Sequence, residues 1–154
     1  MRKATSTDLA LLVLRFGLGG IMLAHGLQKL GLVPGGPGGI QQTVDWMGTM
    51  SIPPWMAYFS ILAEVGGGFF LIIGFLGKLA SFGIAFNLAA AIYKVHLTKG
   101  FFNPLGVEFP LALFAMAAAL MVAGMGAMSL DAKIASSMDR AIAGKKDKEA
   151  PPPS

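Results

Sequence analysis

Four long apolar segments, separated by polar or glycine- and proline-rich stretches, set the pattern of this chain. They cover residues 9–30, 55–75, 79–97 and 109–125. An α-helix rises about 1.5 Å per residue and the hydrocarbon core of a bilayer is about 30 Å thick, so a segment of about 20 apolar residues can cross it. The pattern therefore predicts an all-α fold, a four-transmembrane-helix bundle.

The segment between the first two spans is expected to form a short helix at the membrane interface. Residues 31–54 carry glycine and proline at both ends, and Ile40, Val44 and Met47 recur at helical spacing between them. Trp46 adds an aromatic ring of the kind that lies at membrane interfaces. We expect this helix to cover the outer end of the bundle.

The two ends of the chain are expected to lie outside this bundle. Residues 1–8 form a short polar N-terminus, and residues 9–127 hold the four-helix membrane domain. Apolar side chains recur every fourth position within residues 128–143, which is typical of an amphipathic helix on a membrane surface. The charged and proline-rich residues 144–154 are expected to be disordered.

Small residues inside the spans predict close helix packing. Gly66, Gly67 and Gly68 follow one another in the second span, where glycine lets another backbone approach closely. The connection formed by Gly77 and Lys78 is so short that the second and third spans must be antiparallel neighbours.

The composition indicates an integral membrane protein. The 154 residues are 55% hydrophobic and only 13% charged, whereas soluble domains average about 25% charged residues. The formal net charge is +4, but the basic residues are scattered among helix ends and the tail. We therefore expect the lipid bilayer as a partner, and no nucleic acid.

The absence of cysteine excludes disulfides, thiol redox chemistry and iron–sulfur ligation from this chain. His25 and His96 are the two histidines, and they do not form a close metal-ligand motif such as HxxxH. We expect no metal site.

The distribution of lysine and arginine predicts the orientation of the protein, because cytoplasmic flanks of membrane helices carry more of both. One side holds Arg2, Lys3, Lys78, Lys133, Arg140, Lys145, Lys146 and Lys148, and the other holds Lys29, Lys94 and Lys99. Both termini are therefore expected to be cytoplasmic, in a multi-pass protein of a bacterial-type inner (plasma) membrane. Because Arg15 interrupts its apolar core, the first span is expected to be retained and not cleaved as a signal peptide.

Polar side chains inside the spans need protein or water around them, since a charge at lipid depth costs at least ~2.5–3.5 kcal/mol. Arg15, His25 and Lys29 share one helical face of the first span with Met22. The remaining ones are Glu64 near the middle of the second span, Asn87 and His96 in the third, and Glu108 at the start of the fourth. Most of these residues belong to the outer half, which predicts a polar cavity beneath residues 31–54.

Glu64 is the strongest single candidate for chemistry. A carboxylate at this depth beside Arg15, His25 or Lys29 can stay charged or carry protons. The alternative is structural, since an ion pair in a membrane can serve only to hold helices together.

For His25 and His96, three roles are open. They could ligate a haem between the first and third spans, but their estimated depths differ by about 5 Å and other haem-binding signals are absent. They could form hydrogen bonds near the outer interface, or contact a quinone carbonyl, because imidazole both donates hydrogen bonds and relays protons.

Four stretches carry a resemblance to a known family. They read LRFGLGGIMLAHGLQKL (14–30), AEVGGGFFLIIGF (63–75), VHLTKGFFNPLGVEFPL (95–111) and GMGAMSLD (124–131). In this order they resemble the DoxX family of small membrane proteins. The resemblance implies a four-helix membrane bundle with recurring polar positions at Arg15, His25, Lys29, Glu64, His96 and Glu108. Family members include the small subunit type associated with thiosulfate:quinone oxidoreductase and a terminal quinol oxidase, and proteins linked to membrane complexes that handle oxidative stress.

These observations lead to one hypothesis and its rivals. In the hypothesis, a cavity formed by Arg15, Lys29, Asn87, His96 and Glu108 binds a quinone, and Glu64 and His25 handle protons. The chain has no redox centre of its own, so it would act as a subunit beside other membrane or peripheral redox subunits. The main rival is a non-catalytic membrane scaffold or assembly partner. A small transporter is weaker because four spans show no broken-helix repeat, although a homo-oligomer would revive it.

Overall fold

The computed structural model describes residues 4–102 and 104–149, with side chains described as far as Lys145. This part of the chain is helical and contains no strand, which confirms the all-α prediction. The six α-helices are α1 (Ser6–Lys29), α2 (Ile40–Gly48), α3 (Pro54–Ile73), α4 (Gly77–Ala91), α5 (Glu108–Ala123) and α6 (Leu130–Glu149). A π-helical turn, Ile92–His96, and a 3₁₀ turn, Leu97–Lys99, extend α4.

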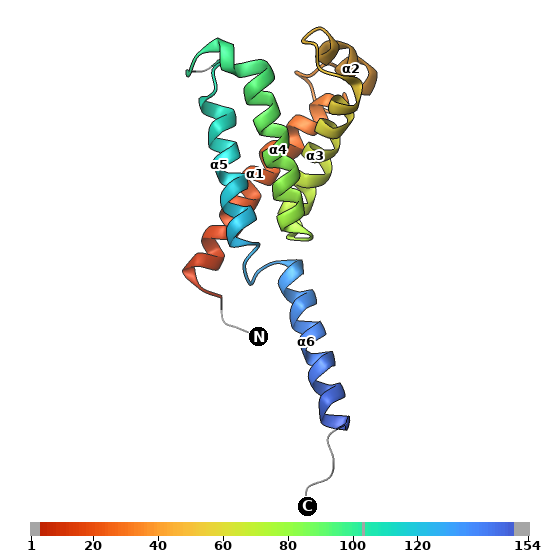
Figure 1. The fold of residues 1–154 in the computed structure, drawn as a ribbon, viewed down its shortest axis with the longest axis vertical. Helices are drawn as coiled ribbons and strands as arrows, with labels where there is room; N and C mark the ends of the chain where they lie inside the picture. The colour runs from red at the N-terminus through yellow and green to blue at the C-terminus, as the bar shows by residue number, and fades with distance from the viewer. Residues whose placement is uncertain (1–3, 103, 150–154) are drawn as a thin grey trace, which may run out of the picture.

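Helices α1, α3, α4 and α5 form one bundle in which α1 packs on α3, α3 on α4, α4 on α5 and α5 back on α1. Figure 1 shows α2 at one end of this bundle and α6 at the other. The segments Ser6–Lys29, Pro54–Ile73 and Gly77–Lys99 are long and apolar enough to cross a membrane, whereas the apolar α5 has 16 residues and is shorter. The four predicted apolar helices are therefore all present.

Glycine brings α1 and α3 into direct backbone contact. A Cβ atom at Gly19 would lie 2.8 Å from the carbonyl oxygen of Gly68, and a Cβ atom at Gly26 would lie 2.8 Å from the backbone nitrogen of Val65. Gly67 faces α4 instead, where a Cβ atom would lie 3.0 Å from the Ile84 side chain. The predicted close approach of another backbone is confirmed at Gly68.

The loop before α6 is fixed to the bundle by hydrogen bonds. The backbone N–H of Ala127 donates to Asp8 Oδ1 at the start of α1 at 2.8 Å. The backbone N–H groups of Leu76 and Gly77 donate to the two carboxylate oxygens of Asp131 at 2.9 and 3.0 Å. Asp131 therefore caps the N-terminus of α4, where it also stabilises the left-handed backbone of Leu76 (φ 47°).

Helix α6 differs from the prediction in length and in direction. It continues to Glu149, so residues 144–149, predicted to be disordered, are helical. These residues are mostly lysine, aspartate and glutamate, which a helix tolerates, and the first proline comes only at position 151. Residues 150–154 lie outside the described residues.

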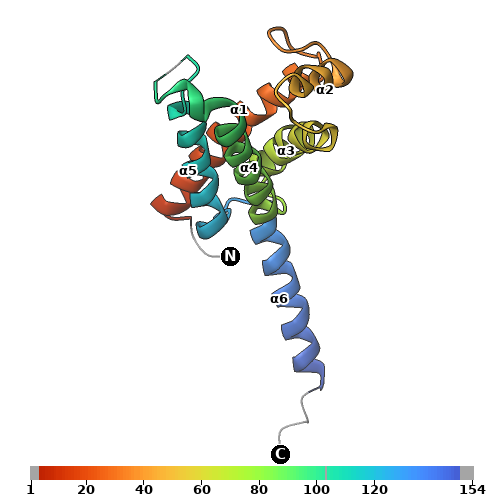
Figure 2. The ribbon, with the colours of Figure 1, turned by 45° about the horizontal axis from the view of Figure 1, so that its top comes forward.

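The second difference is that α6 extends away from the bundle and does not lie across its end (Figures 1 and 2). The hydrogen bonds of Asp131 set this direction at the first turn. As a result, Ile134, Met138 and Ile142 on its apolar face stay 41%, 59% and 56% exposed.

Candidate functional site

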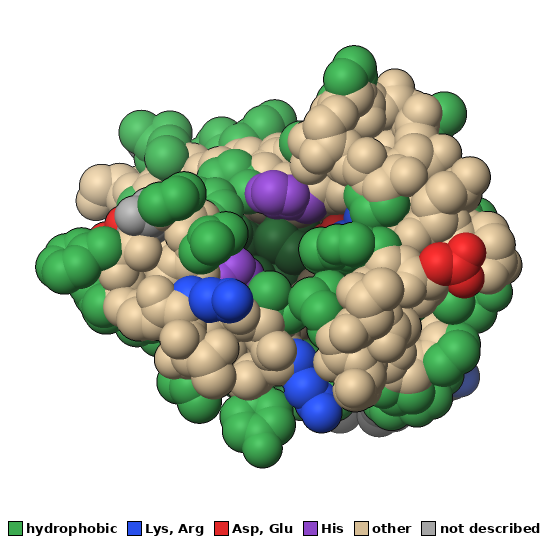
Figure 3. All heavy atoms as spheres, turned by 90° about the horizontal axis from the view of Figure 1, so that it is seen from above, with side chains coloured by type: hydrophobic (Ala, Val, Ile, Leu, Met, Phe, Trp, Pro, Cys, Tyr) green, Lys and Arg blue, Asp and Glu red, His purple; other side chains and the backbone are tan. Residues whose placement is uncertain are grey.

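A cavity of about 360 Å³ lies at the end of the bundle that carries α2. Viewed from this end, the surface is hollowed, and both histidines lie at the rim of the hollow among apolar side chains (Figure 3). Each of α1, α2, α3, α4 and α5 contributes to its wall, as do the π-helical turn and the loop after α2. The size is within the range of small-molecule sites, about 300–1,000 Å³.

Helix α2 is held beside this cavity by its one buried side chain. Thr43 is fully buried, and its hydroxyl donates a hydrogen bond to the backbone carbonyl of Lys29 at the end of α1 at 2.9 Å. Trp46 and Met47 from the same helix line the cavity. The short helix predicted within residues 31–54 is present and covers part of this end.

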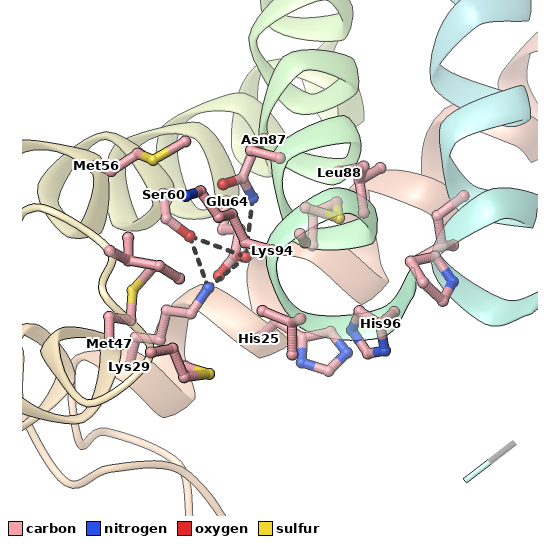
Figure 4. A pocket seen from close by; sticks show the side chains of 18 of the residues that line it. His25, Lys29, Met47, Met56, Ser60, Glu64, Asn87, Leu88, Lys94 and His96 are labelled. Atoms are coloured by element: carbon pink, nitrogen blue, oxygen red, sulfur yellow. Dashed lines mark hydrogen bonds and ion pairs between the residues drawn. The ribbon is translucent and has the colours of Figure 1, made fainter. Parts of the chain in front are cut away.

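A polar cluster of Glu64, Lys29, Ser60 and Asn87 forms one wall of the cavity (Figure 4). Lys29 Nζ donates to Glu64 Oε1 at 2.5 Å and to Ser60 Oγ at 2.8 Å. Asn87 Nδ2 donates to the same Glu64 oxygen at 3.1 Å, and Ser60 Oγ lies 3.4 Å from it. Residues from α1, α3 and α4 therefore meet at a single carboxylate oxygen.

The second oxygen of this carboxylate, Glu64 Oε2, has no hydrogen-bond donor among the described residues. Glu64 is only 6% exposed, and no described residue donates a hydrogen bond to its Oε2 atom, which is buried. A buried carboxylate oxygen without a donor is unfavourable, because it has lost its hydration without replacement. Glu64 therefore has unused capacity to accept a hydrogen bond.

The π-helical turn places three consecutive residues, Lys94, Val95 and His96, on the cavity wall. Single π-helical turns are frequent at functional sites, because the wider turn changes which side chains share a face. His96 Nδ1 lies 2.8 Å from the backbone carbonyl of Leu105. A carbonyl only accepts, so Nδ1 carries the hydrogen, and in the neutral ring Nε2 is an acceptor.

His25 lies opposite α5 at the rim of the cavity. Its ring centroid is 6.4 Å from that of Phe109, with the two planes tilted by 55°. The contact connects α1 to α5 at the end where both rings also line the cavity. This pair leaves the His25 nitrogen atoms available for a polar contact.

The rest of the wall is apolar and rich in methionine. Met47, Met50 and Met56 come from α2, the following loop and α3, and Met22 comes from α1. Methionine side chains are flexible and polarisable, so they adapt to ligands of different shape. The cavity thus combines an adaptable apolar wall with a few fixed polar groups.

Five of the seven residues predicted for the site do line this cavity: His25, Lys29, Glu64, Asn87 and His96. The other two, Arg15 and Glu108, do not line its wall. Glu108 is the first residue of α5, where the positive end of the helix dipole favours an anion, and the cavity wall begins at its neighbour Phe109.

Arg15 lies toward the opposite end of the bundle and is only 1% exposed. Its guanidinium group donates to the backbone carbonyls of Leu71 and Ile72 at the end of α3, at 2.9 and 2.8 Å. It also donates to the carbonyls of Met125 and Met128 in the loop before α6, both at 3.0 Å. Arg15 therefore joins α1, α3 and this loop, and does not balance the charge of Glu64.

Two parts of the site were not predicted. Ser60 precedes Glu64 by one helical turn on the same face of α3, so its spacing was the available signal. The π-helical turn has no such signal in the sequence. Among the described residues, no group of three or more histidine and acidic side chains is close enough to hold a metal ion.

Comparison with known proteins gives one family and one relative. The model of the DoxX family matches residues 10–97, which include Lys29, Glu64, Asn87 and His96. A protein of Bacillus subtilis (strain 168) named "Putative oxidoreductase CatD" is 28% identical over 126 residues, covering 82% of this chain and 87% of that protein. No solved structure matches the chain significantly.

Proposed function

Because this chain belongs to the DoxX family, we propose that it is a quinone-interacting subunit of a membrane oxidoreductase complex, with the cavity at its α2 end as the quinone site. The observation that carries the proposal is the Glu64 carboxylate, which is buried in the cavity wall and still has one oxygen without a donor. The name of the relative, an oxidoreductase by its description, supports the same class of function.

The cavity fits a flat ring with polar oxygens. Its wall is mostly apolar, as the ring requires, while Glu64, His25 and His96 supply hydrogen-bonding groups at separate places. A bound quinone would supply the ability to take up two electrons and two protons.

The residues of the chain have separate roles in this proposal. Glu64 carries protons between the cavity and the ligand, and Lys29 forms an ion pair with its carboxylate. Ser60 and Asn87 hold the carboxylate in place. His25, at the rim, is the second proton carrier, since an imidazole ring can both accept and donate a proton.

Electrons have to come from another subunit. The sequence has no cysteine, and the described residues hold no cluster of metal-binding side chains. The proposed protein therefore provides a ligand site and a route for protons, and a membrane or peripheral partner provides the redox centre.

In this proposal the four apolar helices cross a bacterial plasma membrane and both termini are cytoplasmic. Lys78, Lys133, Arg140 and Lys145 belong to the α6 end, whereas Lys29, Lys94 and Lys99 belong to the cavity end. More lysine and arginine on the α6 side favours its placement in the cytoplasm. The cavity then opens toward the outer face.

The proposal is tested by purifying the protein gently from its own membranes and measuring bound quinone by solvent extraction and mass spectrometry. We expect about one quinone per chain in the wild type and a large loss in Glu64→Gln. Lys99→Gln is the matched control, because Lys99 is exposed at the same end and does not line the cavity. Equal quinone content in wild type and Glu64→Gln would contradict the role of Glu64.

A scaffold function is the alternative, and one observation favours it. The Lys29–Glu64–Asn87 contacts join α1, α3 and α4, so they could serve only to fix helix packing. In that case Glu64→Gln would lower the thermal stability in detergent, no quinone would copurify with the wild type, and a partner protein would.

A further inference from the structure

Helix α6 has an apolar face that no other described part of the chain covers. Leu130, Ile134, Met138 and Ile142 follow one another at four-residue steps, which places them in a single row along an α-helix. These residues are 39%, 41%, 59% and 56% exposed. This row is the apolar stripe of α6. When the bundle spans a membrane, α6 projects from the membrane surface (Figures 1 and 2), so the stripe meets water and would be stabilised by a partner.

A shallow hollow lies beside the stripe. It is lined by Ile134 and Met138 from the stripe and by Lys133, Ser137 and Ala141 from the adjacent row. Ser137 and Ala141 are small, so this row is lower than the stripe. A ridge of large side chains beside a row of small ones is the surface on which the ridge of another helix packs. Helix α6 therefore has both surfaces that it needs to pack against a copy of itself.

The charges of α6 favour a second copy over lipid headgroups. Residues 130–149 include five basic and four acidic side chains, whereas a helix on an anionic membrane surface has a polar face rich in lysine and arginine. The signs are also sorted: Lys133 and Lys145 belong to the row on one side of the stripe, and Asp139 belongs to the row on the other. In two parallel helices whose stripes face each other, the lysine side of each copy lies beside the aspartate side of the other. The two copies are thus complementary in charge.

Insertion into one membrane gives two copies the alignment that this contact needs. The start of α6 is fixed to its own bundle by Asp131, whose carboxylate accepts hydrogen bonds from the backbone N–H groups of Leu76 and Gly77 at 2.9 and 3.0 Å. Copies with the same orientation in the membrane therefore begin α6 at the same depth and on the same side. Confinement to the membrane also raises the effective concentration of the two helices, which compensates for a short interface.

From these observations we propose that α6 is a dimerisation helix, which pairs in parallel with the α6 of a second copy of this chain. The apolar stripe of each copy packs into the hollow of the other, with Met138 near the centre of the contact. The two-fold axis of the pair runs along the membrane normal. The contact lies at the end of the molecule opposite to the cavity and does not depend on the ligand of the cavity.

The absence of cysteine from the sequence allows a direct test with single cysteines. Met138→Cys and Ser136→Cys are made in the full chain, and membranes of the producing cells are oxidised with copper phenanthroline. The readout is the disulfide-linked dimer on a non-reducing gel. We expect at least about fivefold more dimer in Met138→Cys, because a two-fold axis brings the same residue of both copies side by side. Ser136 is the matched control, since it lies on the opposite side of α6 between Ile134 and Met138.

A second pair of variants tests the contact without a cross-link. Met138→Glu puts a charge into the apolar stripe and should lower the ratio of dimer to monomer at least about 10-fold, because the paired helices would have to bury that charge. Ser136→Glu should leave the ratio unchanged. The measurement is native mass spectrometry of the protein released from lipid nanodiscs. Both variants should keep the thermal stability of the wild type, since Met138 is 59% exposed and the Ser136 hydroxyl donates only to the backbone carbonyl of Lys133 in its own helix.

The other possible covers of the stripe are outcomes of the same experiment. Equal cross-linking of Met138→Cys and Ser136→Cys, or none in either, overturns the proposal. If neither cross-links, a water-soluble maleimide shows what replaces it: slower labelling of Met138→Cys indicates lipid or another protein on the stripe, and equal labelling indicates an open face. A wild type that is monomeric in nanodiscs, or a dimer that persists in Met138→Glu, also overturns pairing through the stripe.

Discussion

The guanidinium group of Arg15 on α1 donates a hydrogen bond to the carbonyl oxygen of Ile72 at the end of α3, at 2.8 Å. The last carbonyls of a helix have no partner within the helix, and in a membrane protein they have little water to replace it. Arg15 satisfies two of them in α3, at Leu71 and Ile72, and two more carbonyls in the loop before α6. A charge inside the first span is thus explained by backbone groups, without an acidic partner in the cavity.

Replacing Arg15 by methionine should destabilise the protein by roughly 2–4 kcal/mol, because four backbone carbonyl groups lose a hydrogen bond from Arg15 at once, and only that of Leu71 keeps a second donor, the N–H of Gly74. Arg15→Lys should be intermediate, since an ammonium group has three donors and lacks the planar geometry. The measurement is thermal unfolding in detergent. Loss of ligand binding in folded Arg15→Lys, with normal stability, would instead indicate a role in the cavity.

The Lys29–Glu64 pair should behave as a coupled unit. Lys29→Met alone leaves a buried carboxylate without its cation and should cost roughly 3–5 kcal/mol, whereas Lys29→Met combined with Glu64→Gln should recover most of that stability. Denaturant unfolding of the wild type, both single variants and the double variant gives the coupling energy. Additive effects in this cycle would show that the two side chains do not interact.

The glycine contact between α1 and α3 can be tested at Gly19, with the adjacent Gly20 as a control. Gly19→Ala should destabilise the bundle by roughly 1–3 kcal/mol, because its Cβ atom would lie 2.8 Å from the Gly68 carbonyl oxygen and the helices would have to separate. Gly20→Ala should be neutral or stabilising by up to about 1 kcal/mol, since nothing lies within 4 Å of its Cβ position. Thermal unfolding of the two variants side by side is the test. Equal effects would contradict the close contact.

The capping role of Asp131 can be measured against Asp139 on the same helix. Asp131→Ala removes the acceptors of Leu76 and Gly77 and should cost roughly 1–2 kcal/mol, with faster hydrogen exchange at the first turn of α4. Asp139→Ala should change stability by no more than about 0.5 kcal/mol, as for other exposed surface positions. Unchanged exchange at Leu76 and Gly77 in Asp131→Ala would rule out the cap.

Hydropathy and spacing predicted the helices well, because long apolar segments indicate helices and the glycine and proline between them indicate where the helices end. They also placed Lys29, Glu64 and Asn87 at one cavity. They could not choose the partner of Glu64, since a helical wheel gives the face and depth of a side chain but not the reach of a lysine or arginine. Arg15 was misplaced for this reason. Its acceptors are backbone carbonyls, and because every residue has one, the sequence does not indicate which of them accept a hydrogen bond.

Two further features depended on local geometry that residue patterns do not encode. Helix α6 continues past residue 143 because its polar residues tolerate helix, although the same residues are typical of disorder. Its direction depends on the hydrogen bonds of Asp131 to a turn more than 50 residues earlier in the chain.

The π-helical turn at Ile92–His96 also has a consequence for how this protein tolerates changes in length. In this turn the N–H of Leu97 donates to the carbonyl of Ile92, five positions back, so the segment holds one residue more than an α-helical turn would. Deleting a single residue within it would restore regular α-helical spacing and leave the segments before and after the turn in nearly the same relative orientation, because the turn only accommodates the extra residue. Three consecutive side chains of a regular α-helix do not share one face, so Lys94, Val95 and His96 would no longer all line the cavity. The extra residue of this turn is therefore as important to the site as the side chains themselves.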